Sequence, residues 1–370
     1  MRIVHVSDCY APRTGGIETQ VAGLARAQSA AGHDVSVITA TPGHEGVFAG
    51  PDVVDGIRVD RAAAHVPFEL PIHPRTAHVV RDLLALDMPD VVHIHLGAVS
   101  PFAWGATRAA VSMRLPVLVT VHSMWGPLAR AGYSTTRAMR DLHDEGVQLS
   151  AVSDVAAAAV TRSIPHAAPV LVVPNGIDPR AWPVRDSVPG PTDELRLVSV
   201  LRMAPRKRTA ALVRVLADAS RALGGQVSIT ATLVGDGPDR KRAMSLADRR
   251  GIAIEFTGRL DRSGIQDVFA RSDAYIQPST RESFGIAALE ARTSGLPIIV
   301  RRESGTTQFV HEGVEGLVVR GDAGLVGGIV RMARDPGLLS RIREHNRSTQ
   351  PHETWTNVLV DVERAYTAAR

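Results

Sequence analysis

Residues 274–291, AYIQPSTRESFGIAALEA, hold a strand, a loop and a helix within one short segment. The apolar run 274–277 predicts a buried strand, and the pattern over 284–294 predicts a helix that begins near Ser283. A helix N-terminus offers free backbone N–H groups and the positive end of the helix dipole. The segment therefore predicts a site for a phosphate or a polarised sugar oxygen where the strand ends.

Two carboxylates flank this predicted helix start. Glu282 lies just before it, and Glu290 lies about two turns inside it. A carboxylate only accepts hydrogen bonds, which suits the hydroxyls of a sugar. Gly285 would let a ligand approach the backbone closely. The plainer alternative is a capping acid followed by a surface acid, and the segment alone leaves both readings open.

The same alternation of strand and helix recurs along the chain. Short runs rich in Val and Ile predict strands at 3–6, 35–39, 91–95, 117–121, 170–173, 195–201, 227–234, 252–256, 274–277 and 297–300. Helical patterns lie between many of them, at 18–31, 76–87, 207–223, 239–250 and 284–294. The runs are almost wholly apolar, as strands covered on both faces should be. We therefore expect an α/β protein with parallel sheets and right-handed crossovers.

A segment rich in Pro and Gly divides the chain of 370 residues into halves. Residues 179–194 have the composition of a linker, which predicts one domain over 1–180 and another over 181–351. The pattern indicates two Rossmann-like domains that face a cleft, with ligands at the carboxyl ends of the strands. Residues 1–180 carry 14 basic and 16 acidic side chains, whereas 181–370 carry 28 and 22. The second domain is thus the better place for an anionic ligand.

Composition excludes several classes of protein. Aromatic residues make up only 4% of the chain and the net charge is +4, so we expect no nucleic-acid partner. A single cysteine excludes an intrachain disulfide and a multi-cysteine zinc site. The sequence holds no apolar run long enough to span a membrane, and its first apolar residues are too few for a signal-peptide core. We therefore expect a cytosolic protein.

A basic loop follows one predicted strand. In the segment 200–208, VLRMAPRKR, a strand is expected to end at Leu201 and a helix to start near Lys207. Arg202 can bind two phosphate oxygens at once, and Lys207 can act as a point charge. Only two lysines occur in the chain, against 40 arginines, so a lysine at this position suggests a specific role. A solvated basic loop is the ordinary alternative.

Two weaker features lie in the first half. Gly15 and Gly16 precede a predicted helix, where such a pair can form an anion-binding nest or a plain turn. His122 follows the strand 117–121, and a functional or a structural role is equally compatible with that position. His93 and His95 share one face of a strand, but the sequence suggests no third ligand, so we expect no metal site.

Together these segments resemble the retaining glycosyltransferases of family 4, which have the two-domain GT-B fold. The resemblance covers nearly the whole chain and rests on seven motifs in the family's order. They are Gly15–Glu18, the T-x-H of Thr120–His122, Val173–Asp178, Arg202-x4-Lys207, Val234–Pro238, Phe256–Gly258, and Pro278–Gly285 with Glu290. The tail, about 352–370, resembles the family's C-terminal helix, which crosses back onto the N-terminal domain. Leu201, Met203 and Arg206 depart from the family's usual residues around the phosphate arginine.

The resemblance implies roles for matched residues. A nucleotide-diphosphate sugar would bind the second domain as donor, with Arg202 and Lys207 on its diphosphate. The backbone of Ser283, Phe284 and Gly285 and the Gly15–Gly16 loop would assist. Glu290 would bind the ribose hydroxyls, and Arg259 would lie near the base.

The transferred hexose would be held by Glu282, with His122 contacting it from the first domain. The resemblance implies a retaining, front-face transfer, and the absence of an Asp-x-Asp pair suggests that no metal is required. GDP-mannose, UDP-glucose and UDP-N-acetylglucosamine all remain open as donors, and the family includes mannosyltransferases of glycan or glycolipid biosynthesis. The acceptor could be lipid-linked, a glycan or a small molecule, which leaves peripheral contact at the inner membrane face open. We expect it at loops 9–16, 65–75 and 123–137.

Three other activities remain open at this point. A non-catalytic sugar-nucleotide-binding protein and a GT-B-fold sugar-nucleotide epimerase would both retain the donor motifs. An α-glucan phosphorylase of this fold would need a lysine for pyridoxal phosphate, and Lys207 and Lys241 are the only lysines.

Overall fold

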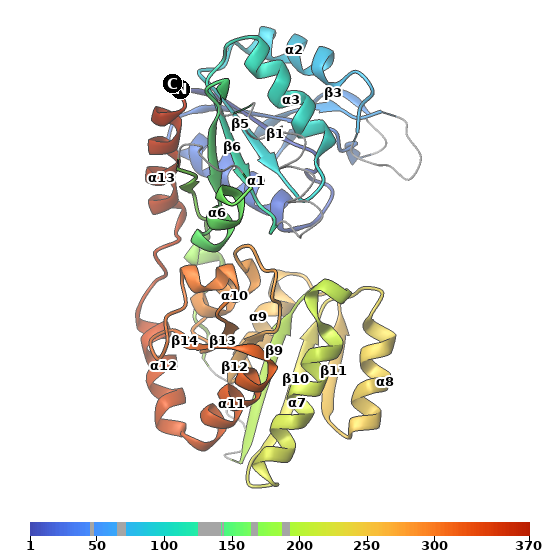
Figure 1. Ribbon diagram of the computed structural model, residues 1–370, viewed down its shortest axis with the longest axis vertical. Coiled ribbons are helices and arrows are strands. Elements are labelled where there is room, and N and C mark those ends of the chain that lie inside the picture. The colour runs from blue at the N-terminus through green and yellow to red at the C-terminus, as the bar shows by residue number, and fades with distance from the viewer. Residues whose placement is uncertain (45–47, 65–71, 125–141, 143, 164–168, 187–192) are drawn as a thin grey trace. The chain divides into compact units, whose positions relative to one another are not determined.

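The computed structural model describes residues 1–370 except 45–47, 65–71, 125–141, 143, 164–168 and 187–192. The chain forms two compact units, one made of Met1–Gly176 with Glu353–Arg370 and the other of Ile177–His352. Each unit contains a sheet of mainly parallel strands with helices between them (Figure 1). The predicted α/β class with two such domains is confirmed.

The first unit is built on an eight-stranded sheet with the order β3-β4-β2-β1-β5-β6-β7-β8. All neighbouring pairs are parallel except β3 with β4, which are antiparallel. The strands are β1 (Arg2–Ser7), β2 (Asp34–Thr39), β3 (Ala49–Val54), β4 (Ile57–Ala62), β5 (Val91–Leu96), β6 (Val117–Val121), β7 (Gln148–Ala151) and β8 (Leu171–Val172).

Its helices are α1 (Gly16–Ala30), α2 (Thr76–Asp87), α3 (Pro101–Ser112), α6 (Asp154–Thr161) and α13 (Trp355–Ala368). The last of these, drawn in red in Figure 1, packs beside α1 although it ends the chain. Val358, Val362 and Tyr366 from α13 join the core formed by α1 and strands β1 and β2. The predicted return of the C-terminal helix to the first domain is thereby confirmed.

Two glycines are explained by the Trp355 ring of α13, which packs directly against their backbone. A Cβ at Gly23 on α1 would lie 2.3 Å from the Trp355 ring, and one at Gly176 would also lie 2.3 Å from it. Real Cβ atoms do not approach another atom so closely, so both positions need glycine for the indole to pack there.

The second unit has a six-stranded sheet with the order β11-β10-β9-β12-β13-β14, and all its pairs are parallel. Its strands are β9 (Glu194–Val200), β10 (Ser228–Val234), β11 (Ala253–Gly258), β12 (Ala274–Gln277), β13 (Ile298–Arg301) and β14 (Gly316–Val319). Its helices are α7 (Thr209–Leu223), α8 (Arg240–Arg250), α9 (Arg262–Ala270), α10 (Ile286–Thr293), α11 (Gly321–Arg334) and α12 (Pro336–Ser348). Three short 3-10 turns complete the unit, at Pro179–Ala181, Pro205–Lys207 and Gly305–Gln308.

Two predicted boundaries shift in this unit, both next to the candidate site. The helix expected to begin near Ser283 begins at Ile286, because Gly285 has φ +96° and cannot belong to a right-handed helix. The helix expected near Lys207 begins at Thr209, because Lys207 ends a 3-10 turn and Arg208 has φ +63°. Both strand-to-helix loops are therefore longer than the sequence indicates.

Within the part of the chain that the structure describes, no helix is both long enough and apolar enough to cross a membrane.

We predict that Gly23→Ala destabilises the first unit. The new methyl would overlap the Trp355 ring, and overpacking of this kind costs about 1–3 kcal/mol. Gly327→Ala on α11 is the matched control, since a Cβ there meets nothing within 4 Å and a helical alanine gains about 0.5–1 kcal/mol over glycine. Denaturant unfolding followed by tryptophan fluorescence and circular dichroism checks both. Equal effects from the two alanines would contradict this account of the packing.

Candidate functional site

An ion pair joins two loops of the second unit. Lys207 Nζ lies 2.6 Å from Glu282 Oε2, and the two side chains are 24% and 12% exposed. Lys207 follows β9 and Glu282 follows β12, and these strands are parallel neighbours whose carboxyl ends meet at the same edge. The sheet topology thus brings together a cation and a carboxylate that the sequence places 75 residues apart.

Further contacts hold Glu282 in place. Gln277 Nε2 donates to Glu282 Oε2 over 3.3 Å, and the backbone N–H of Gly305 donates to the Glu282 carbonyl over 2.8 Å. Ser279 Oγ, in the same loop, is 3.5 Å from the Lys207 carbonyl oxygen. The carboxylate therefore points toward Lys207 from a loop anchored on both sides.

Gly285 is required at the start of α10 for two reasons. Its φ of +96° is disfavoured for any residue with a Cβ, and a Cβ there would lie 2.6 Å from Thr306 Oγ1. The neighbouring Phe284 is buried against Phe309, with ring centroids 5.2 Å apart. The backbone at Ser283–Gly285 is thus anchored by a buried ring, and it leads into the first N–H groups of α10.

Glu290 lies about one turn inside α10, and its carboxyl group has an unusual acidity. Burial raises the pKa of its carboxyl to about 8, while the charge of Arg262 opposes that rise. Glu290 is therefore mainly protonated at neutral pH in the ligand-free protein. A carboxyl group whose pKa is raised this far by burial marks a candidate functional site.

The basic loop after β9 is shaped by a glycine-containing turn. A Cβ at Gly235 would lie 2.1 Å from the Leu201 carbonyl oxygen, and one at Gly237 would lie 2.4 Å from that of Met203. Met203 also donates its N–H to the Asp236 carbonyl over 2.9 Å. The motif Val234–Pro238, which sequence reasoning noticed only through the family resemblance, supports this loop.

Two arginines of the predicted site are exposed. Arg202 lies two residues after β9, and Arg259 follows β11 directly. Both strand ends belong to the same edge of the sheet, so these guanidinium groups lie at the edge that carries Lys207 and Glu282.

In the first unit, His122 follows β6 directly. Its Nε2 lies 2.9 Å from Nδ1 of His95, and its side chain also hydrogen-bonds to Asn175. Burial lowers the pKa of His122 to about 4 despite the Asn175 contact, so the imidazole is neutral at pH 7. A cavity of about 20 Å³ borders His122 and Asn175, which is room for about one water molecule.

Other features of the first unit differ from the sequence-based expectations. Gly15 has φ −176° and is the extended N-cap of α1, and Gly16 is the first residue of that helix. His93 and His95 do acquire a third neighbour, since β1 places His5 beside them and their ligand atoms lie within 4.8 Å of one another. Of the predicted acceptor loops, residues 65–71 and 125–137 lie outside the described residues.

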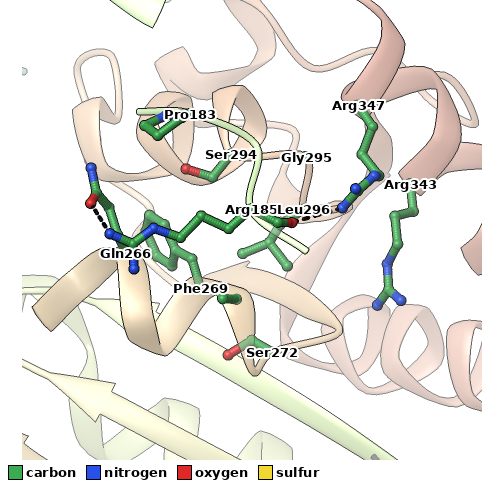
Figure 2. A pocket seen from close by; sticks show the side chains of 11 residues that line it. Pro183, Arg185, Gln266, Phe269, Ser272, Ser294, Gly295, Leu296, Arg343 and Arg347 are labelled. Carbon is green, nitrogen blue, oxygen red and sulfur yellow. Dashed lines mark hydrogen bonds between the residues drawn. The ribbon is translucent and has the colours of Figure 1, made fainter. Parts of the chain in front are cut away.

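Figure 2 shows a separate pocket of the second unit, at the amino ends of β12 and β13. Three arginines line it, and each has an intramolecular partner. Arg185 pairs with Asp267 and Gln266, Arg343 with Asp273, and Arg347 donates to the Arg185 carbonyl over 3.0 Å. These arginines connect the segment after the 3-10 turn Pro179–Ala181 to α9 and α12. We therefore assign the pocket a structural role.

Comparison with known proteins identifies the family. Residues 14–181 match the model described as Glycosyltransferase Family 4, and residues 182–349 match glycosyl transferases group 1. The chain belongs to glycosyltransferase family 4. It is therefore a transferase, and the prediction of an enzyme of this class is confirmed.

Individual relatives agree with this assignment. The glycosyltransferase is 28% identical to a glycogen synthase of Mycobacterium tuberculosis, over 100% of this chain and 95% of that one. It is 26% identical to a GDP-mannose-dependent alpha-(1-6)-phosphatidylinositol dimannoside mannosyltransferase of the same species, over 84% and 82% of the two chains. The structure of sucrose-phosphate synthase from Thermosynechococcus elongatus matches with a TM-score of 0.77 at 19% identity, over 99% and 98%. The GT-B fold is thereby confirmed.

We predict that Glu290→Gln flattens the pH dependence of stability above pH 7. With a folded pKa of about 8 against an ordinary 4.5, the folded state holds a proton between these pH values that the unfolded state lacks. The contribution of Glu290 to the free energy of unfolding should therefore fall as pH rises through this window, by at most about 1.4 kcal/mol per unit. Four histidines of the first unit, whose pKa values are lowered by burial, add stability as pH rises toward 6.5, so urea unfolding at pH 7 to 8 isolates the Glu290 slope. The exposed Glu344→Gln should keep the wild-type slope, and a wild-type slope in Glu290→Gln would refute the assignment.

Proposed function

We propose that this glycosyltransferase moves a hexosyl unit from a nucleotide-diphosphate sugar to an acceptor, with retention of anomeric configuration. The observation that carries the proposal is the Lys207–Glu282 pair at the carboxyl edge of the sheet, beside the Gly285 start of α10. A cation, a carboxylate and a helix N-terminus in this order suit a diphosphate on one side and a sugar on the other.

The diphosphate is the part of the donor that the basic loop would bind. When the glycosidic bond breaks, negative charge develops on the leaving nucleoside diphosphate, and preorganised positive groups stabilise it. Lys207, Arg202 and the N–H groups at the start of α10 would supply that potential. In this proposal the protein's own cations take the role that a metal has elsewhere, so transfer proceeds without one.

The nucleoside would extend toward Glu290. Its ribose hydroxyls would donate to the Glu290 carboxylate, which must lose its proton to accept both. The base would lie near Arg259, and the backbone of Ser283 and Phe284 would line the passage between phosphate and ribose. Since such backbone contacts do not depend on side-chain type, UDP and GDP donors both remain compatible with the residues present.

Glu282 would bind hydroxyls of the transferred hexose rather than attack its anomeric carbon. Its carboxylate is already engaged by Lys207 and Gln277, which is an arrangement for holding a group in place. In the front-face mechanism that we propose, the acceptor attacks from the side of the leaving group and a donor phosphate oxygen takes its proton. His122, neutral and partly exposed, would contact the same hexose.

The donors and acceptors named for the relatives suggest the range for this chain. One of them is a glycogen synthase and another is a GDP-mannose-dependent alpha-(1-6)-phosphatidylinositol dimannoside mannosyltransferase. We therefore propose UDP-glucose, UDP-N-acetylglucosamine or GDP-mannose as donor, and a glycan, a lipid-linked sugar or a small molecule as acceptor. A lipid-linked acceptor would place the enzyme at the inner face of the membrane.

We predict that Lys207→Ala and Arg202→Ala each lower kcat/KM by about 10²–10³-fold, as the loss of one preorganised donor does. Lys241→Ala is the matched control, since Lys241 is the only other lysine and lies on α8. The measurement is release of nucleoside diphosphate from each donor, together with the thermal shift caused by UDP, GDP and ADP. Wild-type rates and shifts in both loop variants, with cooperative melting, would refute the assignment of the diphosphate site.

We predict opposite effects of Glu282→Gln on binding and on turnover. The neutral amide releases Lys207 from its ion pair, so the nucleoside diphosphate should bind at least as tightly as to the wild type. Transfer should nevertheless fall by about tenfold or more, because one good hydrogen bond to the hexose is lost. Calorimetry with the free nucleoside diphosphate and initial rates with the sugar donor separate the two effects. Parallel loss of binding and rate would contradict a sugar-binding role.

A further inference from the structure

Four histidines form a buried hydrogen-bonded cluster in the first unit. We call it the histidine network, and it consists of these imidazoles with one amide and one phenol: His5, His93, His95, His122, Gln28 and Tyr366. His5, His93 and His95 are at most 2% exposed. Burial lowers the pKa of every imidazole in it, to about 4 for His5, so all four are neutral at pH 7.

A metal ion is not the best explanation of this cluster. The ligand atoms of His5, His93 and His95 lie within 4.8 Å of one another. All six of their ring nitrogens, however, already face a hydrogen-bond partner at 2.7–3.0 Å. Since a ligand must turn a free lone pair toward the ion, binding a metal would break this whole set of bonds.

One branch of the network runs in a line to His122. Gln28 Oε1 lies 2.7 Å from His5 Nε2, and His5 Nδ1 lies 2.9 Å from His95 Nε2. The His95 Nδ1 then lies 2.9 Å from His122 Nε2. A neutral imidazole has one N–H and one lone pair, so the sense of the first bond determines the sense of all that follow.

The other branch starts at the same amide. Gln28 Nε2 donates to the Tyr366 hydroxyl over 2.9 Å, which leaves that hydroxyl to donate to His93 Nδ1 at 3.0 Å. His93 Nε2 then donates to Thr120 Oγ1 at 2.7 Å, and Thr120 donates to Ser150 at 2.7 Å. Each donor in this branch meets an acceptor, so the amide orientation satisfies both branches at once.

Only two arrangements of protons satisfy the line from Gln28 to His122. With Oε1 toward His5, all three histidines of the line carry their proton on Nε2. With the amide reversed, all three carry it on Nδ1. A mixture would place two lone pairs or two hydrogens face to face in a dry interior, which costs about 1–3 kcal/mol for each unpaired group.

We propose that Gln28 is a positioning residue that sets the tautomer of His122 through His5 and His95. With the amide placed as in the structure, His122 carries its proton on Nε2 and keeps a lone pair on Nδ1. That lone pair is left to accept a hydrogen bond from a substrate hydroxyl. The contact of His122 with a hexose hydroxyl rests on the proposed function, whereas the assignment of its tautomer does not.

The direct test is nitrogen-15 NMR of the histidine side chains in the ligand-free enzyme. The expected spectrum shows His122, His95 and His5 as neutral Nε2–H tautomers. The signals of His122 are identified as those that are missing from the spectrum of His122→Gln. A predominant Nδ1–H form of His122 in the wild type would overturn the proposal, as would a joint shift of the His5, His93 and His95 signals on removal of metal with EDTA.

Two variants of Gln28 separate positioning from packing. Gln28→Glu, held as the neutral acid by its burial, keeps an acceptor toward His5 and a donor toward Tyr366. His122 should therefore remain Nε2–H, and kcat/KM should stay within about threefold of wild type. Gln28→Leu removes that acceptor, so His122 should become a mixture of tautomers and kcat/KM should fall by about tenfold. An unchanged His122 tautomer in folded Gln28→Leu would overturn the proposal. Should the leucine variant fail to fold, the wild-type spectrum and Gln28→Glu still decide.

Thr107→Val is the matched control for stability. Thr107 is a fully buried residue of α3 whose hydroxyl donates to the Ala103 carbonyl over 2.8 Å, outside the network. Its loss should lower the melting temperature without changing the His122 tautomer or kcat/KM. If His122→Gln retains full transfer activity while the tautomer is as expected, the proposed contact with the hexose fails and the positioning by Gln28 stands.

Discussion

The candidate site depends on the ion pair between Lys207 and Glu282. Both side chains are mostly shielded from water, so each charge would be costly without the other. The pair also joins the loop after β9 to the loop after β12, and its partners Gln277 and Gly305 extend the connection to β12 and to the turn after β13. A ligand anion that reaches Lys207 must therefore compete with Glu282 or share the cation with it, which couples occupation of the phosphate side to the position of the carboxylate.

Backbone approach shapes the rest of this edge of the sheet. Gly235 and Gly237 leave room for carbonyl oxygens of the basic loop, and Gly285 leaves room for Thr306. All three have positive φ, so a side chain at any of them would strain the backbone as well as displace a neighbour. The conformation of these loops is therefore determined by close contacts with the main chain of these glycines. The exposed Arg202 and Arg259 lie at this edge of the sheet.

The sequence predicted the parts of the fold that depend on local pattern. The apolar runs of β9, β12 and β13 and the helices α7, α8 and α10 are found close to their expected bounds, whereas α9 was not predicted. The order of these strands places Lys207 and Glu282 at one edge. The sequence could not predict the start of α10, because the left-handed conformation of Gly285 beside Thr306, 21 residues further along the chain, is a feature of the folded structure. Nor could it find His5, whose contact with His93 exists only through the register of β1 with β5. Gln28, from which both branches of the histidine network start, lies in α1. The sequence pattern of that helix indicates only that it is amphipathic, so the role of Gln28 could not be predicted.

The helix α13 contributes to the interior of the first unit from a part of the chain far from the rest of that unit. α13 contributes Trp355, which fills the space above Gly23 and Gly176, and Tyr366, which bonds to both Gln28 and His93. Until this helix docks, the Gln28 amide lacks the partner for its N–H groups and His93 lacks a donor for Nδ1. Buried neutral imidazoles are stable when both nitrogens are paired, so the polar interior of the first unit depends on residues 353–370 as well as on residues 1–176.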